Sequence, residues 1–102
     1  MLCAHTVRRL KPGTFDEFRE AFRPASDNPP PGWVRFHMLR GLADDEVVTF
    51  GFFDGSLEEL EASQQDAGYY QQRQTIDSFV DDVIANGVYE IVESWTAEGA
   101  AA

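Results

Sequence analysis

The sequence is poor in cysteine and in positive charge, and it contains no long apolar run. Cys3 is the single cysteine among the 102 residues, so a disulfide within the chain is excluded and a reducing compartment is expected. Cys3 and the two histidines also provide too few ligands, wrongly spaced, for a structural zinc site.

The scarcity of Lys and Arg limits the partners that the chain can bind. Eight basic residues against 18 acidic ones give a formal net charge of -10, and nucleic acids and anionic membranes are bound through clustered positive charge. The longest apolar run, residues 47–53, is interrupted by Thr49 and is too short to cross a bilayer. The N-terminal segment contains His5 and two arginines where a signal peptide needs an apolar core. We therefore expect a cytoplasmic protein with no nucleic-acid or membrane partner.

The chain has the composition of a packed domain, with 43% hydrophobic and 13% aromatic residues. A chain of this length has no room for two independent cores. We expect residues 1–96 to form one domain and residues 97–102 to be a flexible tail.

The first third of the chain predicts a strand, a helix and a loop. Residues 2–10 show strand-like alternation. Thr14 and Glu17 have capping-box spacing and open a helix that Pro24 is expected to end. Residues 24–32 hold four prolines and predict a loop, a stiff connector in preference to a lid. Three aromatic residues share one face of the helix: Phe15, Phe18 and Phe22.

Residues 33–40 and 46–53 predict a hairpin whose register follows from its apolar residues. With Arg40 opposite Glu46, one face is wholly apolar, and a slip of one residue would destroy this match. The pairs on that face are Met38–Val48, Phe36–Phe50 and Val34–Phe52. The mixed second face holds Trp33, Arg35, His37 and Leu39 against Phe53, Gly51, Thr49 and Val47.

The second half predicts two helical stretches and a strand. A second capping box begins at Ser56 and predicts a helix to about residue 65. Another helical stretch is predicted over 69–85, where Asn86-Gly87 provides a C-terminal stop. Residues 88–95 predict the last strand.

This order, β-α-β-β-α-β, predicts an α+β, ferredoxin-like fold with a four-stranded antiparallel sheet in the order 4-1-3-2. Both helical regions would cover one face of the sheet. The open face would carry apolar side chains, and an apolar patch of that size implies a partner. We therefore expect a homodimer formed through this face. The apolar residues expected there are Trp33, Leu39, Val47, Phe53 and Val92.

Three segments resemble the dimeric α/β barrel superfamily, in its antibiotic-biosynthesis-monooxygenase-like branch. They are residues 11–18 (KPGTFDEF), residues 49–57 (TFGFFDGSL) and residues 88–95 (VYEIVESW). The resemblance implies a dimer that exchanges the last strand. It also implies activities such as cofactor-independent oxygenation of aromatic polyketides or haem degradation. Phe53 stands where many members carry Trp, and residues 61–69 lack the helix histidine of haem-degrading members, which disfavours haem degradation.

His37, His5 and Tyr69 are the candidate catalytic residues. Only the histidines have an ordinary pKa near neutrality, so either could deprotonate a phenolic or enolic substrate that then passes an electron to dioxygen. The favoured alternative is a structural strand histidine, with His37 paired to Thr49. Tyr69 stands at the break between the helical stretches, where its hydroxyl could orient a ligand.

Five further residues are candidates for ligand binding: Arg35, Phe36, Phe50, Phe52 and Tyr70. Arg35, predicted opposite Gly51, could bind an anionic group, although an ion pair at the dimer interface is the preferred role. The phenylalanines are core residues first, and they line an apolar pocket only if they leave the core unfilled. For Tyr69 and Tyr70, the alternative to ligand binding is a structural role, with one tyrosine in the core and the other at the surface.

These features predict a cofactor-independent monooxygenase-like protein acting on a small aromatic or enolisable metabolite. The alternative is a non-catalytic homodimeric module that binds a hydrophobic small molecule or has a structural role. No cofactor is expected. No metal is expected either, because the acidic runs at 44–46, 58–59 and 81–82 are dispersed along the chain.

Overall fold

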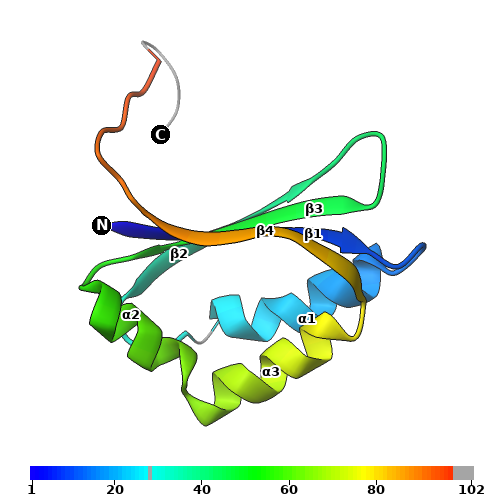
Figure 1. The fold of residues 1–102 in the computed structure, drawn as a ribbon, viewed down its shortest axis with the longest axis horizontal. Coiled ribbons are helices and arrows are strands. Elements are labelled where there is room, and N and C mark those ends of the chain that lie inside the picture. The colour runs from blue at the N-terminus through cyan, green and yellow to red at the C-terminus, as the bar shows by residue number, and fades with distance from the viewer. Residues whose placement is uncertain (28, 98–102) are drawn as a thin grey trace.

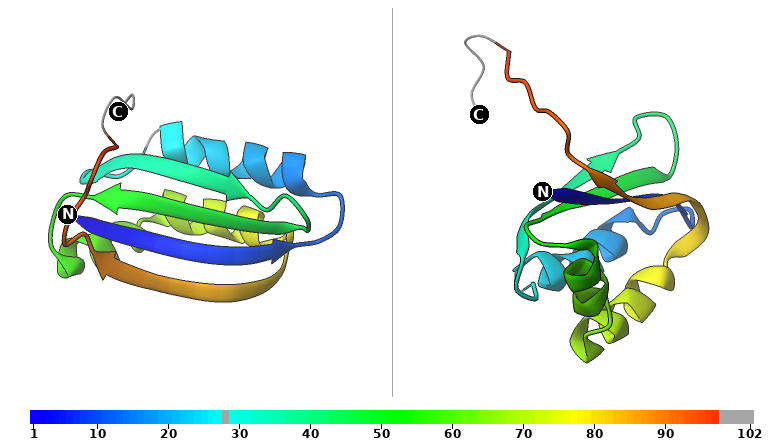
Figure 2. Two further views of the ribbon diagram at one scale, coloured as in Figure 1. Left: turned by 90° about the horizontal axis from the view of Figure 1, so that it is seen from above. Right: turned by 60° about the vertical axis from the view of Figure 1, so that its left-hand side comes forward.

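The computed structural model describes residues 1–27 and 29–97, and it has two layers (Figure 1). A four-stranded sheet forms one layer and three helices cover one of its faces (Figures 1 and 2). The elements are β1 (Leu2–Leu10), α1 (Phe15–Asp27), β2 (Trp33–Arg40), β3 (Glu46–Phe53), α2 (Leu57–Gln64), α3 (Ala67–Asp77) and β4 (Val80–Glu90).

The strands lie in the order β2-β3-β1-β4, and all neighbouring strands are antiparallel. This is the predicted order 4-1-3-2, and the α+β, ferredoxin-like arrangement is confirmed. We call the sheet face that the helices leave uncovered the open face. The segment after β4 runs away from the sheet on the side of the open face (Figure 1).

The helix starts differ in how well the sequence predicted them. The capping box at Ser56 is confirmed, because the Ser56 hydroxyl accepts a hydrogen bond from the Glu59 amide and the Glu59 carboxylate accepts one from the Ser56 amide, both at 3.1 Å. At the start of α1, the Thr14 hydroxyl donates instead to the Lys11 carbonyl at 2.7 Å. Helix α1 also continues beyond Pro24 to Asp27, since one missing backbone donor removes a single helical hydrogen bond.

Strand β4 corrects the prediction for the end of the chain. Residues 80–85, predicted as helix, are strand, Asn86-Gly87 lies within the strand, and the strand ends at Glu90 rather than residue 95. Two β-bulges, at Asp81 and Ile84, each insert one extra residue against β1. The β4 residues that pair with the helix-facing residues of β1 therefore follow one another at intervals close to those on one face of a helix. They are Val80, Val83, Asn86 and Val88. This spacing explains why a helix was predicted for the first part of β4.

The hairpin register differs from the predicted one by one residue. The Gly41 amide donates to the Glu46 carbonyl at 2.8 Å, so these two residues, and not Arg40 and Glu46, close the turn. Phe36 consequently pairs with Gly51 rather than Phe50. The buried residues of β3 are then Val47, Thr49, Gly51 and Phe53, whereas Phe50 and Phe52 lie on the open face.

This register also changes which residues form the open face. Val47 and Phe53, predicted there, are 1% and 2% exposed on the helix side. Trp33 also lies on the helix side, because an irregularity between Trp33 and Arg35 reverses its direction. Leu39 remains on the open face with half of its surface exposed. Val92 is exposed but lies beyond β4.

The core lies between the sheet and the helices. Its buried cluster contains residues from both layers: Leu10, Phe18, Val47 and Ile76. Phe18 is completely buried, and its ring packs on Phe22 of the same helix at 6.0 Å. Val83 and Ile84, for which the predicted helix over 69–85 implied a buried face, are 48% and 44% exposed in β4.

No described helix is long and apolar enough to cross a membrane. Residues 91–97 follow β4 without regular secondary structure. Except for Ala97, the predicted tail at 97–102 lies outside the described residues.

Phe18→Ala is expected to lower the free energy of unfolding by about 3–5 kcal/mol, because it removes a fully buried ring and leaves a cavity. Urea denaturation followed by circular dichroism measures this change. Leu42→Ala is the control, since Leu42 is fully exposed in the hairpin turn and its loss is expected to change stability by less than about 0.5 kcal/mol. Equal effects of the two substitutions would contradict the assigned core.

Candidate functional site

A cavity of about 220 Å³ lies between the sheet and the helices, and every helix and strand contributes to its wall. Side chains from α1, α2 and α3 cover it, and the helix-facing residues of the strands form its floor. Its polar side chains are Thr6, Arg8, Thr49, Gln64, Tyr69, Arg73 and Asn86. A concave space with a few convergent polar groups is the usual form of a small-molecule site.

The floor of the cavity contains a polar row that crosses three strands. Thr6 of β1 pairs with Thr49 of β3 on one side and with Asn86 of β4 on the other. The Thr6 hydroxyl donates to the Asn86 side-chain oxygen at 3.3 Å. Beside this row, Arg8 Nη1 donates to the Thr49 hydroxyl at 2.7 Å. These contacts fix the direction in which the Arg8 guanidinium points.

Arg8 is the buried cation of the site, with 6% of its surface exposed. Its Nε is buried and has no hydrogen-bond acceptor among the described residues. Burial lowers the pKa of Arg8, and the positive charge of Arg73 lowers it further. Asp77 and Tyr69 act in the opposite direction. Because arginine titrates far above neutrality, Arg8 keeps its charge at neutral pH, and it is a poorly solvated cation at the cavity wall.

Gly51 makes room for the aromatic wall of the cavity. A Cβ atom at this position would lie 2.8 Å from Phe36 and from Trp33. The Trp33 and Phe36 rings stack over it at 5.2 Å between centroids, and Trp33 Nε1 donates to the Ser63 hydroxyl of α2 at 3.2 Å. The glycine in β3 thus allows two rings to approach the backbone of the sheet.

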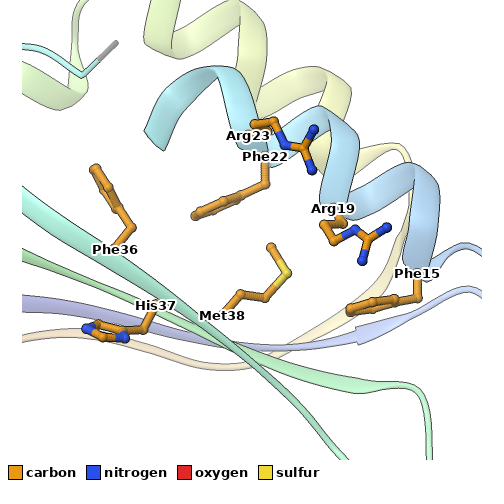
Figure 3. Close-up of a pocket in the computed structure, with 7 residues that line it drawn as sticks. All are labelled: Phe15, Arg19, Phe22, Arg23, Phe36, His37 and Met38. Carbon is orange, nitrogen blue, oxygen red and sulfur yellow. The ribbon is translucent and has the colours of Figure 1, made fainter. Parts of the chain in front are cut away.

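A second space, which we call the outer groove, lies between α1 and β2 (Figure 3). It has a volume of about 320 Å³. Phe15, Phe22 and Met38 point into it in Figure 3, and Arg19 and Arg23 extend from α1 along its rim. Phe22 and Phe36 line both the outer groove and the cavity, and their rings meet edge to face at 6.4 Å. This pair therefore forms the partition between the two spaces.

Three of the predicted site residues lie at the cavity. Tyr69 reaches it from the first turn of α3, and Phe36 reaches it from β2. Phe50 contributes to the lining, although its ring stacks on His37 on the open face. Tyr70 does not line the cavity or the outer groove and is 59% exposed, so the two tyrosines divide between interior and surface as the alternative expected.

The structure brings the two histidines to the same region, but on the open face. His5 and His37 pair with Phe50 from its two sides, and the His37 ring stacks on it at 5.0 Å. His37 borders the outer groove, yet its ring points to the other side of β2 from Phe36 (Figure 3). The imidazole of His5 contacts Tyr89 edge to face at 6.0 Å.

Two predicted contacts are wrong because of the register shift. His37 does not pair with Thr49, whose hydroxyl accepts from Arg8 on the opposite face of the sheet. Arg35 lies opposite Phe52 instead of Gly51. Its guanidinium stacks 4.7 Å above the Phe52 ring on the open face.

The polar floor of the cavity was not predicted from the sequence. Arg8 belongs to no recognisable motif, Thr49 was considered only for a segment resemblance and as a partner of His37, and Asn86 was assigned to a helix stop. One signal could have identified Arg8: it lies in phase with Thr6 and Leu10 on the core-facing side of β1. A charged residue in phase with a buried face is unusual and often functional.

The described residues contain no group of three or more His, Cys, Asp or Glu side chains arranged to hold a metal ion. The cavity instead offers guanidinium, hydroxyl and amide groups, which bind and orient organic ligands.

Comparisons with known proteins identify the fold. No protein-family profile and no curated protein matches the chain. A solved structure from Nitrosomonas europaea, provisionally named as an antibiotic biosynthesis monooxygenase, has 20% sequence identity and a TM-score of 0.76, over 91% of this chain and 100% of that one.

Two further structures agree. SnoaB, a cofactor-independent oxygenase from Streptomyces nogalater, has 16% identity and a TM-score of 0.75, over 91% of this chain and 95% of that one. A protein of Deinococcus radiodurans, also provisionally named as an antibiotic biosynthesis monooxygenase, has 14% identity and a TM-score of 0.77, over 97% of this chain and all of that one. The chain therefore has the ferredoxin-like fold of these three structures, two of which are named as antibiotic biosynthesis monooxygenases, the group that its sequence resembles.

Proposed function

We propose that the protein is a cofactor-independent, monooxygenase-like enzyme that acts on a small aromatic or enolisable metabolite in the cavity. The observation that carries this proposal is Arg8, a buried guanidinium at the cavity wall whose Nε has no acceptor among the described residues. The names of the structural neighbours support the reaction class, and the aromatic wall of Trp33 and Phe36 supports a flat ligand.

Arg8 would stabilise the anion formed when the substrate loses a proton. A cation held in place by Thr49 and shielded from water interacts strongly with charge that develops beside it. Binding the enolate or phenolate beside the guanidinium would also offset a positive charge that burial leaves poorly solvated. Arg73, on α3, adds a second positive charge to the same cavity.

Tyr69 is the proposed catalytic partner of Arg8, because it is the predicted catalytic residue whose side chain reaches the cavity. Its hydroxyl can hydrogen-bond the substrate oxygen and orient the ring over the sheet. His5 and His37 lie on the open face, so we assign them to the dimer interface proposed below.

The reaction balances without an external reductant when a CH₂ group becomes a carbonyl. The substrate loses a proton to give the carbanion or enolate, which passes one electron to dioxygen. The radical pair combines to a peroxide anion, with a new C–O bond, and this anion takes back a proton, equivalent to the one lost in the first step, to give the hydroperoxide. Loss of water from this hydroperoxide leaves the carbonyl, so one oxygen atom enters the product and the other leaves as water.

Arg8→Gln is expected to lower kcat/KM by on the order of a hundredfold, because it removes the charge that stabilises the anion. Oxygen uptake with a panel of dihydroxyaromatics and anthrone-like compounds provides the assay. The control is Arg9→Gln, an exposed arginine that follows on the same strand and points to the other face. Thermal denaturation of each variant separates loss of activity from loss of fold. Activity that survives Arg8→Gln unchanged would contradict the role given to Arg8.

The alternative is a non-catalytic homodimeric module that binds a hydrophobic small molecule. The observation in its favour is that neither histidine ring contributes a base to the cavity. Ligand binding without oxygen consumption across the substrate panel would favour this alternative over the enzyme.

We also propose that two copies associate through their open faces in the cytoplasm. The open face carries a cluster of rings, in which Phe52 lies 5.8 Å from both His37 and Phe50. Val92 and Trp95, 88% and 81% exposed, belong to the segment that leaves β4 on this side of the sheet (Figure 1). Packing against a second copy would remove these apolar surfaces from water.

Phe52→Glu is expected to convert the dimer to a monomer, because a charge would be buried against the rings of the second copy. Sedimentation at micromolar concentration measures the mass against the chain mass of 11.5 kDa. Tyr70→Glu, a change on the exposed surface of α3, is expected to leave the dimer intact. A wild-type protein that sediments as a monomer would disprove the proposed assembly.

A further inference from the structure

The outer groove and the cavity share a distribution of charge that is unusual in this chain. The protein carries a net charge of -10, yet among the described residues neither lining contains an Asp or Glu side chain. Each space instead has two arginines, Arg8 and Arg73 in the cavity and Arg19 and Arg23 in the outer groove. Half of the eight basic residues therefore border two adjoining spaces.

Two other surface pockets contain acidic residues, in line with the excess of acidic residues in the chain. The pocket beside the hairpin turn includes Asp44 and Asp45, and the one beside α2 includes Asp54, Glu59 and Asp66. Among these four spaces, the cavity and the outer groove are the two without acidic groups in their described linings. This absence favours a negatively charged ligand over a neutral or cationic one.

The volumes of the cavity and the outer groove favour a single ligand that occupies both spaces. The cavity holds about 220 Å³, which is less than the roughly 300–1,000 Å³ of most small-molecule pockets. The outer groove, with about 320 Å³, adjoins it across the Phe22–Phe36 pair. Both spaces joined fall within the usual range, so a two-ring ligand with a side chain would occupy them better than either space alone.

The arginines at the rim contact acidic neighbours within α1. Arg19 lies 3.8 Å from Asp16 and Arg23 lies 3.5 Å from Glu20. All four side chains are more than half exposed. An exposed pair of this kind contributes at most about 1 kcal/mol, so a carboxylate bound in the apolar groove can compete with Asp16 for Arg19, while Arg23 adds its positive charge to the rim.

We propose that the outer groove binds the carboxylate end of an aromatic ligand whose rings occupy the cavity. To enter the cavity, the ligand rings then pass between the side chains of Phe22 and Phe36. This inference rests on the proposed function in placing the reacting rings in the cavity, and it adds the substrate class, an aromatic carboxylate with about two fused rings.

Calorimetric titration with 4-(2-naphthyl)butanoate and with its neutral primary amide tests the charge preference. The wild-type protein is expected to bind the acid about tenfold more tightly at low salt, and this ratio is expected to fall as salt is added. Arg19→Gln/Arg23→Gln is expected to bring the ratio close to one, mainly by weakening the binding of the acid. The matched control, Arg9→Gln/Lys11→Gln, removes two exposed charges outside the groove and is expected to keep the wild-type ratio.

The possible failures are distinguishable. Equal binding of acid and amide by the wild-type protein would overturn the groove proposal and leave the cavity as the proposed active site. Loss of the preference in the control variant would also overturn it, because the effect would then come from net charge. If neither compound binds, the groove proposal and the cavity site both fail.

The rate constants of ligand association and dissociation test whether the ligand passes between Phe22 and Phe36. In a Trp95→Phe background, Trp33 is the remaining tryptophan and lines the cavity. Stopped-flow fluorescence is expected to show that Phe36→Leu raises the association and dissociation rate constants together, with a smaller change in Kd. Unchanged rate constants would contradict passage between the two rings.

Discussion

The alternation of β3 determines which side chains reach each face of the sheet. Thr49 and Gly51 lie beneath the helices in this alternation, where Thr49 accepts the hydrogen bond from Arg8 and Gly51 leaves room for the Trp33–Phe36 stack. A shift of one residue would place Phe50 in the position of Gly51 and fill the cavity with its ring. The cavity, its cation and its aromatic wall therefore all depend on the hydrogen bonds that close the turn before β3.

The interior cation gives an acidic protein a positively charged cavity wall. Most of the carboxylates among the described residues lie on exposed helix faces and turns, where water screens their charge. Arg8 is shielded from water, so its charge acts over a short range with little competition from those carboxylates. The net charge of -10 therefore describes the outer surface and not the environment of a bound molecule.

The sequence predicted the features that local chemistry controls, such as the strand order and the capping box at Ser56. The predictions were wrong where one stretch of sequence fits two structures. Both faces of the hairpin are rich in apolar residues, so hydrophobicity alone did not fix the register. The bulges at Asp81 and Ile84 gave β4 a helical period. For the site, Tyr69 was placed correctly at the break between helices, but Arg8 was missed because only the third dimension brings it to Thr49.

The bulges of β4 also bear on how copies of this chain can assemble. Both edge strands are irregular: β4 at Asp81 and Ile84, and β2 near Val34. A bulged edge is a poor template for another strand, and the adjacent acids Asp81 and Asp82 repel a second β4. Strand-to-strand addition, which would propagate without limit, is therefore disfavoured at both edges. The association proposed through the open face would end at two copies, and the irregular edges disfavour its extension into fibres.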